Sequence, residues 1–392
     1  MMFMNPNHFI SKNKYYLISL FDKIFHLIWK IATYLGVGRN HHKRNNRIIF
    51  IGPTHIGDIL LTTPAIRFVK EKKPDVEIIC IASSSSKAAI VNNPYLAGVE
   101  IIDLPWFTEK KGGLIRSIRC FFYFVKVIKS VNAETALNFS STSYHREHLA
   151  MWLAGVPRRI GFTHKGFGYF LTDNLSFLRN ELIVKQKLRM VGHWLKENTN
   201  HYSLKPDYFI SKGAGKKAED LLESLGINKG KVVIGINPGA QHNFLWPVSN
   251  YIELANMIYN KWKANLLFLG TNSFESLIEH IRTQLEFKTF SLAGKTSLEE
   301  SAAIMKKIDL LISVDTGARH IANAVSTKVV VLRNGANSIY EFGKYVESEK
   351  LIFHEVPCSP CGLQKCKYPR MYCMEDISAK ECFYAVASHG IK

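Results

Sequence analysis

The most constraining feature of this sequence is a recurring pattern: a short apolar run, a turn that contains glycine, and a segment with helical spacing. One such run is residues 47–51, with its turn ending at Asp58, and another is residues 308–314, with its turn at residues 315–317. Apolar, β-branched runs of this length favour strands that are covered on both faces. Further alternation of such runs with helical segments predicts parallel, helix-covered sheets.

The length of the chain and a restart of this alternation predict two α/β domains. At 392 residues the chain exceeds what one hydrophobic core typically holds. A polar passage and then a glycine- and lysine-rich one interrupt the pattern. We expect two Rossmann-like domains that face each other across a cleft. The predicted parts are an N-terminal segment at residues 1–46, a first domain at 47–205, a linker at 206–230, a second domain at 231–356, and a cysteine-rich loop with a last helix at 357–392.

The turn at residues 315–320 has the residue types of a phosphate site. Asp315 or Thr316 can cap the helix that follows, and Gly317 lets a ligand approach the backbone. Unpaired N–H groups and the positive end of the helix dipole attract an anion there. Because a carboxylate and the His320 ring can bind hydroxyls, the turn suits a sugar phosphate. The alternative is an ordinary capped turn with a surface histidine.

The turn after the first strand has a matching position. Ligands of open parallel sheets gather at the carboxyl ends of the strands, where Gly57 and Asp58 lie. The strand at residues 232–236 leads in the same way into Gly239. We therefore expect Asp58 on one lip of the cleft, and Gly239 with residues 315–320 on the other.

Charge and cysteine usage narrow the classes of partner. The formal net charge is +19, with 51 Lys and Arg against 32 Asp and Glu, which points to anionic partners. No recognisable nucleic-acid motif accompanies this charge, so an anionic membrane or phosphorylated substrates are the expected partners. The seven cysteines are not spread as a disulfide framework, which predicts a cytosolic protein.

Residues 15–35 predict an amphipathic helix at a membrane surface. The apolar run is interrupted by four charged or polar side chains, Asp22, Lys23, His26 and Lys30. No stretch therefore reaches the roughly 18–20 apolar residues that a membrane span requires. At about 100° per residue the polar side chains fall on one side, and apolar ones, including Trp29, fall mostly on the other. With the basic run at residues 39–47, this helix suits an anionic bilayer surface; the alternative is an extra helix docked on the first domain.

Five passages of the sequence form an ordered set. They are Gly57-Asp58-x-x-x-Thr62-x-Pro64-Ala65, Arg158-Arg159-Ile160-Gly161-Phe162, Asn237-Pro238-Gly239-Ala240 with Trp246-Pro247, Leu292-Ala293-Gly294-Lys295-Thr296-Ser297-Leu298, and Asp315-Thr316-Gly317-x-x-His320. The set resembles glycosyltransferase family 9, the heptosyltransferase family of lipopolysaccharide core assembly. The resemblance covers roughly residues 47–385.

This resemblance implies the glycosyltransferase B arrangement of two Rossmann-like domains. It also implies an ADP-heptose donor on the second domain and an acceptor saccharide with a lipid anchor on the first. The expected reaction is an inverting transfer that requires no metal or other cofactor. The expected place is the cytoplasm, peripheral on the inner face of the cytoplasmic membrane, with no nucleic-acid partner.

The resemblance and the chemistry together nominate site residues. A sugar hydroxyl needs a base as it attacks, and Asp58 is our candidate; its alternative role is to cap the following helix. The candidates on the acceptor side are His55, Gly57, Thr62 and Arg67. The candidates on the donor side are Gly239, Asp315, Thr316, Gly317, His320 and, more weakly, Glu275. No Asp-x-Asp pair marks a metal site, so we expect backbone N–H groups and basic side chains to meet the departing diphosphate.

Two positions depart from the family pattern. Phe244 and Leu245 stand where the family usually carries a basic pair before Trp246-Pro247. Four residues are candidates for a replacement charge or donor, His242, Asn243, Lys295 and Arg319. The alternatives are a different nucleotide sugar that serves another surface glycan, or a non-catalytic homologue that binds sugar nucleotides.

The C-terminal part carries a cluster of thiols. Cys358, Cys361, Cys366 and Cys373 lie close together in the sequence and begin with a Cys-x-x-Cys pair. Four thiolates can bind zinc tetrahedrally, so we predict a structural zinc site. Two disulfides and four free thiols are the alternatives.

Overall fold

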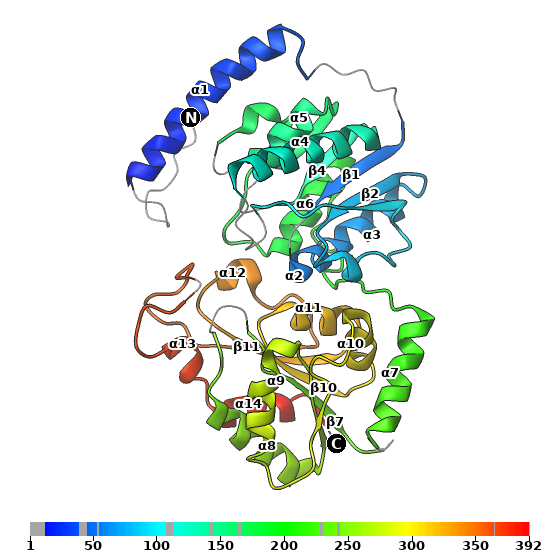
Figure 1. Cartoon of the computed structure of the whole chain (residues 1–392), viewed down its shortest axis with the longest axis vertical. Coiled ribbons are helices and arrows are strands. Elements are labelled where there is room, and N and C mark those ends of the chain that lie inside the picture. Colours follow the sequence, from blue (N-terminus) through cyan, green and yellow to red (C-terminus); the bar gives the residue numbers. More distant parts are fainter. Residues whose placement is uncertain are drawn as a thin grey trace. The chain divides into compact units, whose positions relative to one another are not determined.

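The chain forms two compact units, one on each side of the Ser203–Leu204 peptide bond. In Figure 1 each unit contains a central sheet that is flanked by helices. The computed structural model describes residues 12–38, 45–52, 55–106, 113–140, 145–163, 166–227, 230–240, 244–363 and 365–391. The predicted α/β class with parallel, helix-covered sheets is confirmed.

The first unit is built on a six-stranded parallel sheet with the strand order β3-β2-β1-β4-β5-β6. Its strands are β1 (Arg47–Ile51), β2 (Glu77–Ala82), β3 (Gly98–Ile101), β4 (Thr135–Asn138), β5 (Arg158–Phe162) and β6 (Asp173–Leu175). The order reverses between β1 and β4, which pair directly, with Ile51 opposite Asn138. Open α/β sheets bind ligands at such a reversal, beyond the carboxyl ends of the strands.

Helices cover this first sheet. They are α2 (Ile56–Leu60), α3 (Thr63–Lys72), α4 (Leu114–Val131), α5 (His145–Leu153) and α6 (Ile183–Leu195), with the short 3-10 helices η1 (Lys87–Ala89) and η2 (Gly168–Phe170). The C-terminal half of α4 buries Phe124, Val127 and Ile128 in one cluster with Ile49 and Ile51 of β1. Burial of this kind supplies most of the stability of a short helix in a protein.

The N-terminal helix α1 (Lys12–Tyr34) docks on the first unit by its polar side. The Asp22 carboxylate accepts from the backbone N–H of Phe167 at 2.9 Å, and the His26 ring stacks on Tyr169 at 4.8 Å. Trp29, predicted on the apolar side, also lies against Tyr169, because it follows Asp22 by nearly two full turns. Among the described helices, none combines the length and hydrophobicity needed to cross a membrane.

The second unit repeats the sheet topology of the first. The strand order is β12-β11-β10-β7-β8-β9, all parallel, and the reversal lies between β7 and β10, which pair with Ser313 opposite Asn237. The strands are β7 (Val233–Asn237), β8 (Asn265–Phe268), β9 (Phe290–Ser291), β10 (Leu310–Val314), β11 (Lys328–Arg333) and β12 (Glu349–Phe353). Its core is mostly aliphatic, with Trp246, Tyr251 and Phe268 as its buried aromatic side chains.

The helices of the second unit include one in the segment predicted as a linker. They are α7 (Lys212–Ser224), α8 (Val248–Trp262), η3 (Asn272–Phe274), α9 (Glu275–Arg282), α10 (Leu298–Met305), α11 (Gly317–Ala324), α12 (Ile339–Phe342), α13 (Tyr372–Glu375) and α14 (Ala379–Ala387). Glu219 of α7 pairs with Lys307 at 2.7 Å, and Lys217 pairs with Glu300 of α10 at 3.3 Å. Much of the region at residues 206–230 is therefore a packed part of the second unit.

A carboxyl group is buried in the first unit, close to where α4 and α5 pack together. Glu147, in the first turn of α5, has no exposed surface, and one of its oxygens accepts from the Trp106 indole N–H at 2.7 Å. The other oxygen is buried without a hydrogen-bond partner in the described part of the chain. Burial raises the pKa of Glu147 to about 7, although the bond from Trp106 opposes this shift. Below about pH 7 the protonated form is therefore the favoured one in the folded chain.

We expect the change Glu147→Gln to flatten the pH dependence of stability. The pKa is about 7 in the folded chain and 4.5 ordinarily, so the folded chain binds the extra proton between these values. The free energy of unfolding should fall as the pH rises through that window. Glutamine still accepts from Trp106 but does not ionise. Near pH 8 the variant should be more stable than the parent by on the order of 2–3 kcal/mol.

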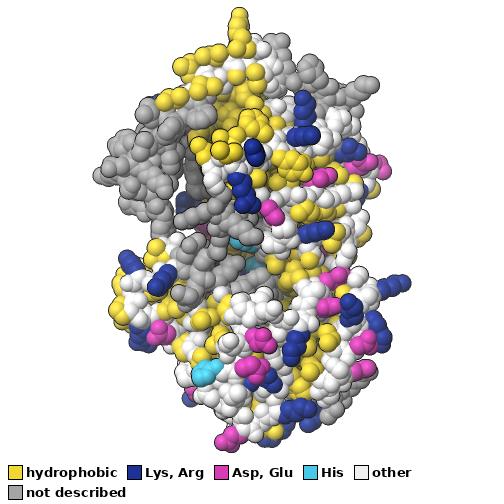
Figure 2. Space-filling view, viewed as in Figure 1, with side chains coloured by type: hydrophobic (Ala, Val, Ile, Leu, Met, Phe, Trp, Pro, Cys, Tyr) yellow, Lys and Arg dark blue, Asp and Glu magenta, His cyan; other side chains and the backbone are white. Residues whose placement is uncertain are grey.

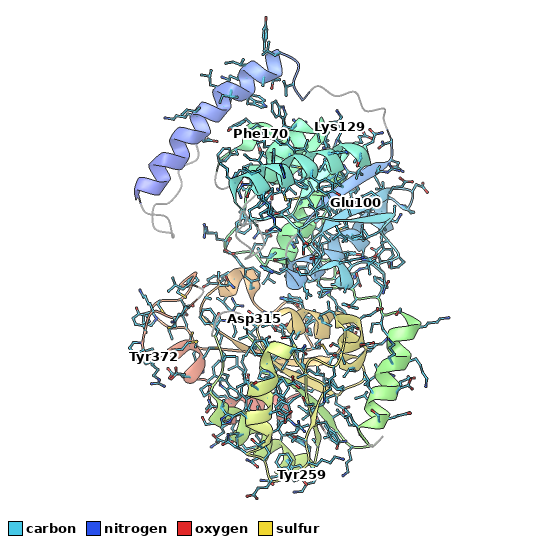
Figure 3. All side chains as sticks on the ribbon, in the orientation of Figure 1. Glu100, Lys129, Phe170, Tyr259, Asp315 and Tyr372 are labelled. Atoms are coloured by element: carbon cyan, nitrogen blue, oxygen red, sulfur yellow. The ribbon has the colours of Figure 1, made fainter. Side chains whose placement is uncertain are left out.

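Urea unfolding at a series of pH values measures this difference. The matched control is Glu100→Gln, because Glu100 is exposed on β3 and is labelled in Figure 3. The control should follow the pH profile of the parent. Parallel profiles for Glu147→Gln and the parent would contradict the assignment.

Candidate active site

The turn after β1 presents a carboxylate at the sheet reversal of the first unit. Asp58 lies in the first turn of α2, and the residue that precedes this helix is His55. Asp58 is therefore not the capping residue, which was its alternative role. Its side chain is half-buried, and within the described residues no hydrogen bond holds its carboxylate. An unengaged carboxylate at this position can accept a proton from a bound hydroxyl.

A buried lysine forms hydrogen bonds with this turn. Lys187 of α6 is 3% exposed and donates to the Asp58 carbonyl at 2.5 Å and to the Thr62 hydroxyl at 2.9 Å. The Thr62 hydroxyl itself donates to the same carbonyl at 2.9 Å. Burial lowers the pKa of Lys187 to about 8, although the charges of Asp58 and Cys80 oppose this shift. Our sequence analysis missed Lys187; its signal is a lysine among the mostly apolar buried residues of α6.

The other acceptor-side candidates divide into two places. His55 is exposed, Gly57 is half-buried, and both lie in the turn with Asp58 and the buried Thr62. Arg67 lies farther along α3, where it donates to the Tyr202 hydroxyl at 3.1 Å and to the Ser203 carbonyl at 3.2 Å. Counting Asp58, four of the five candidates of the first unit therefore lie together. Arg67 is instead hydrogen-bonded to the C-terminal end of that unit.

In the second unit, the loops after β7 and β10 leave the sheet at its reversal. The Gly239 N–H donates to the Asn237 side chain at 3.1 Å. A Cβ at position 239 would lie 2.6 Å from the ring of Phe274, so the packing of that ring requires glycine. Glu275, which follows Phe274, is exposed at the first position of α9. Gly239 and Glu275 therefore belong to one loop cluster beside β10.

The helix α11 begins at the end of β10 with donors that its own backbone cannot use. Its N-cap is Thr316, whose side chain makes no capping hydrogen bond. The first N–H groups of a helix have no intrahelical acceptor, which applies here to Gly317 and Ala318. They lie at the positive end of the helix dipole, which is a suitable place for a phosphate group.

Two arginines bind the Asp315 carboxylate, whereas the sequence predicts that it binds a hydroxyl of the donor sugar. One of its oxygens accepts from Arg319 at 2.8 Å, and the other accepts from Arg333. Arg319 is fully buried and also pairs with the buried Glu349 at 2.6 Å. Burial opposes the charge of Asp315, but Arg319 and Arg333 together lower its pKa below the usual value. Figure 3 labels Asp315 on the second unit; hydroxyl binding by this residue stays a prediction.

His320 lies inside the same network. It is 7% exposed, and its Nδ1 shares a hydrogen bond with the Tyr345 hydroxyl at 2.7 Å. Asn323, one turn later on α11, donates to that hydroxyl at 3.0 Å. These bonds favour a role for His320 in ordering the turn; its expected contact with a sugar hydroxyl stays a prediction.

Hydrophobic side chains occupy the two positions where the family usually carries a basic pair. Phe244 is 5% exposed, and Leu245 is half-buried. Among the candidates for a replacement charge, Arg319 has no exposed surface and is used by two carboxylates, so its charge is already balanced within the core. Lys295 is exposed, whereas His242 and Asn243 lie outside the described residues.

The four cysteines of the C-terminal part share one small cavity. Cys358, Cys361, Cys366 and Cys373 line a space of about 20 Å³ together with Phe244. All four are free thiols in the structure. Across the described ranges, no group of three or more ligand side chains has an arrangement suited to a metal ion. The predicted zinc site therefore has no support beyond this shared cavity.

The change Arg319→Met should strongly destabilise the second unit. It leaves Glu349 buried without its cation, and breaking a buried pair by removing one partner costs about 3–5 kcal/mol. The double variant Arg319→Met/Glu349→Leu removes both charges and should recover much of the loss. Urea unfolding gives the comparison. If the single variant unfolded within about 1 kcal/mol of the parent, the network would not be a main support of the turn.

Comparisons with known proteins identify the family of this chain. Residues 148–371 match the family model described as glycosyltransferase family 9 (heptosyltransferase). The chain is similar to lipooligosaccharide heptosyltransferase 2 of Haemophilus influenzae, with 35% identity over 297 residues that cover 73% of this chain and 82% of that protein. It is also similar to lipopolysaccharide heptosyltransferase 3 of Escherichia coli, with 24% identity over 298 residues that cover 72% and 81%.

Solved structures share the fold. A glycosyltransferase family 9 protein from Veillonella parvula superposes with a TM-score of 0.75 at 18% identity, covering 89% of this chain and 99% of that one. An Escherichia coli heptosyltransferase with ADP superposes with a TM-score of 0.65 at 13% identity, covering 88% and 99%. Because the family model spans more than half of the chain and a relative at 35% identity spans nearly three quarters of it, the chain belongs to glycosyltransferase family 9, the heptosyltransferase family.

Proposed function

We propose that this protein is an inverting, metal-independent heptosyltransferase that moves heptose from ADP-heptose to a lipid-linked saccharide of the lipopolysaccharide core. One observation carries the proposal. Each sheet reverses its strand order at its centre, and each reversal bears a polar turn. The first turn offers a carboxylate at Asp58, and the second offers unpaired N–H groups at Gly317. A base and an anion site are the two parts that such a transfer needs.

The second unit is the proposed donor side. The loop at Gly239 and the start of α11 leave neighbouring strands, so one nucleotide diphosphate can contact both. Solved relatives carry ADP or ADP-2-deoxy-2-fluoro heptose, and these relatives share the fold of this chain. We infer that the adenosine diphosphate group lies against Gly239 and Gly317, with Glu275 near the ribose.

The proposed chemistry is a single displacement. The acceptor hydroxyl oxygen attacks the anomeric carbon from the face opposite to the diphosphate, and the bond from that carbon to the phosphate oxygen breaks. Asp58 takes the hydroxyl proton, and the nucleoside diphosphate leaves with the electron pair. Attack from the opposite face inverts the anomeric centre. The Lys187 bonds to the Asp58 carbonyl and to Thr62 fix the backbone from which the base projects.

The charge that develops on the leaving group needs fixed donors. The sequence has no Asp-x-Asp pair, which supports stabilisation by the backbone at Gly317 and by the dipole of α11. Phe244 and Leu245 contribute no charge. This absence keeps two further candidates open, namely another nucleotide sugar for a different surface glycan, and a non-catalytic homologue that binds sugar nucleotides.

We place the enzyme in the cytoplasm, on the inner face of the cytoplasmic membrane. The net charge of +19 supports an anionic surface as partner. The helix α1 leaves Ile24, Leu27, Ile28 and Ile31 exposed, which supports its proposed contact with lipid. The basic run at residues 39–44 lies outside the described part of the chain.

The change Asp58→Asn should lower turnover by about 10²- to 10⁴-fold while donor binding stays nearly the same, because the amide cannot accept the hydroxyl proton. Transfer of heptose from ADP-heptose to a lipopolysaccharide acceptor that lacks core heptose gives the rate. The matched control is Asp75→Asn, an exposed change in the same unit. Equal turnover of Asp58→Asn and the parent would rule out this base.

The change Gly317→Val should abolish binding of the donor nucleotide, because a branched side chain would occupy the space of the diphosphate. Position 317 is not among the glycines with positive φ, so valine fits the backbone. Thermal shift with ADP, UDP, GDP and their sugars is the measurement, since only a ligand of the folded state stabilises it. ADP and ADP-heptose should give the largest shift for the parent.

A helical glycine in open space supplies the control for this experiment. A Cβ at Gly213 meets nothing within 4 Å, so Gly213→Val should keep the response of the parent to ADP. Full ADP binding by Gly317→Val would move the donor site elsewhere. A larger shift with UDP or GDP than with ADP would favour another nucleotide sugar, and tight ADP binding without any transfer would favour the non-catalytic homologue.

A further inference from the structure

The exposed hydrophobic side chains of this protein are concentrated on two helices. More than half of the large ones in the described residues lie on α1, on the turn after it, and on α4. Both helices belong to the first unit. Figure 2 shows hydrophobic side chains gathered on this unit, in the part where Figure 1 draws these helices. Concentrated exposure of this kind marks an interaction surface.

The two halves of α4 differ in what they contact. The C-terminal half is buried in the first core through Phe124, Val127 and Ile128. The N-terminal half has an apolar stripe at helical spacing that stays largely exposed among the described residues, although the Phe122 ring touches Phe121 at 5.7 Å. Its members and their exposed fractions are Leu114 at 77%, Ile115 at 69%, Ile118 at 47% and Phe122 at 61%. Stability of the fold does not account for these residues, because exposed aliphatic side chains add little to it.

The charges on α4 are all of one sign. Four basic side chains, Arg116, Arg119, Lys126 and Lys129, are exposed along the helix, and the helix contains no acidic residue. Figure 3 labels Lys129 near the end of this helix. None of the four forms an ion pair within the part of the chain that the structure describes. An apolar stripe with unpaired cations beside it is complementary to an anionic lipid surface.

The helix α1 also exposes both apolar and basic side chains. Its acidic residue, Asp22, is used by the Phe167 backbone, whereas Lys23 and Lys30 are exposed. If α1 served only to stabilise the fold, its aliphatic side would be buried. Instead, the side that carries Asp22 is docked, and the aliphatic side is exposed. The position of α1 therefore leaves a second apolar and basic surface on the same unit.

We propose that the exposed stripe of α4 is a second lipid-contacting surface, which rests on an anionic bilayer with its apolar side chains at the headgroup boundary and its cations on lipid phosphates. The proposal deepens the proposed function, since it rests on a lipid-linked acceptor at the membrane. A second copy of this chain fits the stripe poorly, because a two-fold contact would bring the cations of both copies together.

Sedimentation of the full chain with vesicles tests the proposal. The vesicles are phosphatidylcholine alone, or equal parts phosphatidylcholine and phosphatidylglycerol. The parent should bind the anionic vesicles more strongly, with less binding as salt rises. The variant Ile115→Ser/Ile118→Ser/Phe122→Ser should bind them about tenfold more weakly. The variant Arg116→Gln/Arg119→Gln should also bind more weakly, with a smaller response to salt.

The control variant is Val91→Ser/Leu178→Ser, which removes exposed apolar side chains of the first unit that lie outside α4. It should bind anionic vesicles as the parent does. If the α4 triple variant also bound like the parent, the proposal would be overturned. If that variant changed the mass of the protein in solution while its vesicle binding stayed constant, the stripe would be a contact between copies.

A second measurement separates this proposal from the proposed function. The α4 variants should keep the thermal shift of the parent with ADP and its rate with a water-soluble acceptor saccharide. Their rate with acceptor embedded in anionic vesicles should fall about as much as their binding. Loss of the ADP response or of the rate with soluble acceptor would show damage to the enzyme itself, which contradicts a purely lipid-binding role for α4.

Discussion

The Arg319 guanidinium is the group on which the proposed donor side depends most. It has no exposed surface, and it donates to Asp315 at the end of β10, to Glu349 at the start of β12, and to the Phe342 carbonyl at the end of α12. A buried charge persists only when such partners surround it. The start of α11 is consequently held from inside the core, and its N–H groups have a fixed direction before any ligand arrives.

The first unit holds the turn at Asp58, which follows β1, in a different way. Lys187 reaches the turn at Asp58 through neutral oxygen atoms, a carbonyl and a hydroxyl. Burial lowers the pKa of Lys187, whereas neighbouring carboxylates raise that of Arg319 against the effect of burial. Lys187 comes from α6, far from the turn in the sequence, whereas Arg319 lies within the segment that it supports. Only the arginine has its charge balanced by carboxylates. The two halves of the fold share a topology and differ in their electrostatics.

Local patterns in the sequence predicted the parts of this structure that depend on local forces. The apolar runs at residues 47–51 and 308–314 became central strands, and glycine turns follow both. The predicted strands do not include β5, β6, β9 or β12, and β9, with two residues, is too short to show a period. The sequence of α7 predicts a linker because the helix is highly charged and its buried side chains, Ala214 and Ala218, are small and give no apolar stripe. Lys187 and Arg333 reach the turns only after folding, so spacing along the chain could not connect them.

The contact between Gly239 and the Phe274 ring has an evolutionary consequence. Any side chain at position 239 must displace that ring, and the ring immediately precedes Glu275 and the helix α9. The two positions therefore cannot drift independently: a larger residue at 239 becomes tolerable only after 274 has become smaller, so the order of the two mutations matters. Descendants of this protein should therefore keep or change the two positions together. They should carry either glycine at 239 with the ring at 274, or a larger residue at 239 with a smaller one at 274.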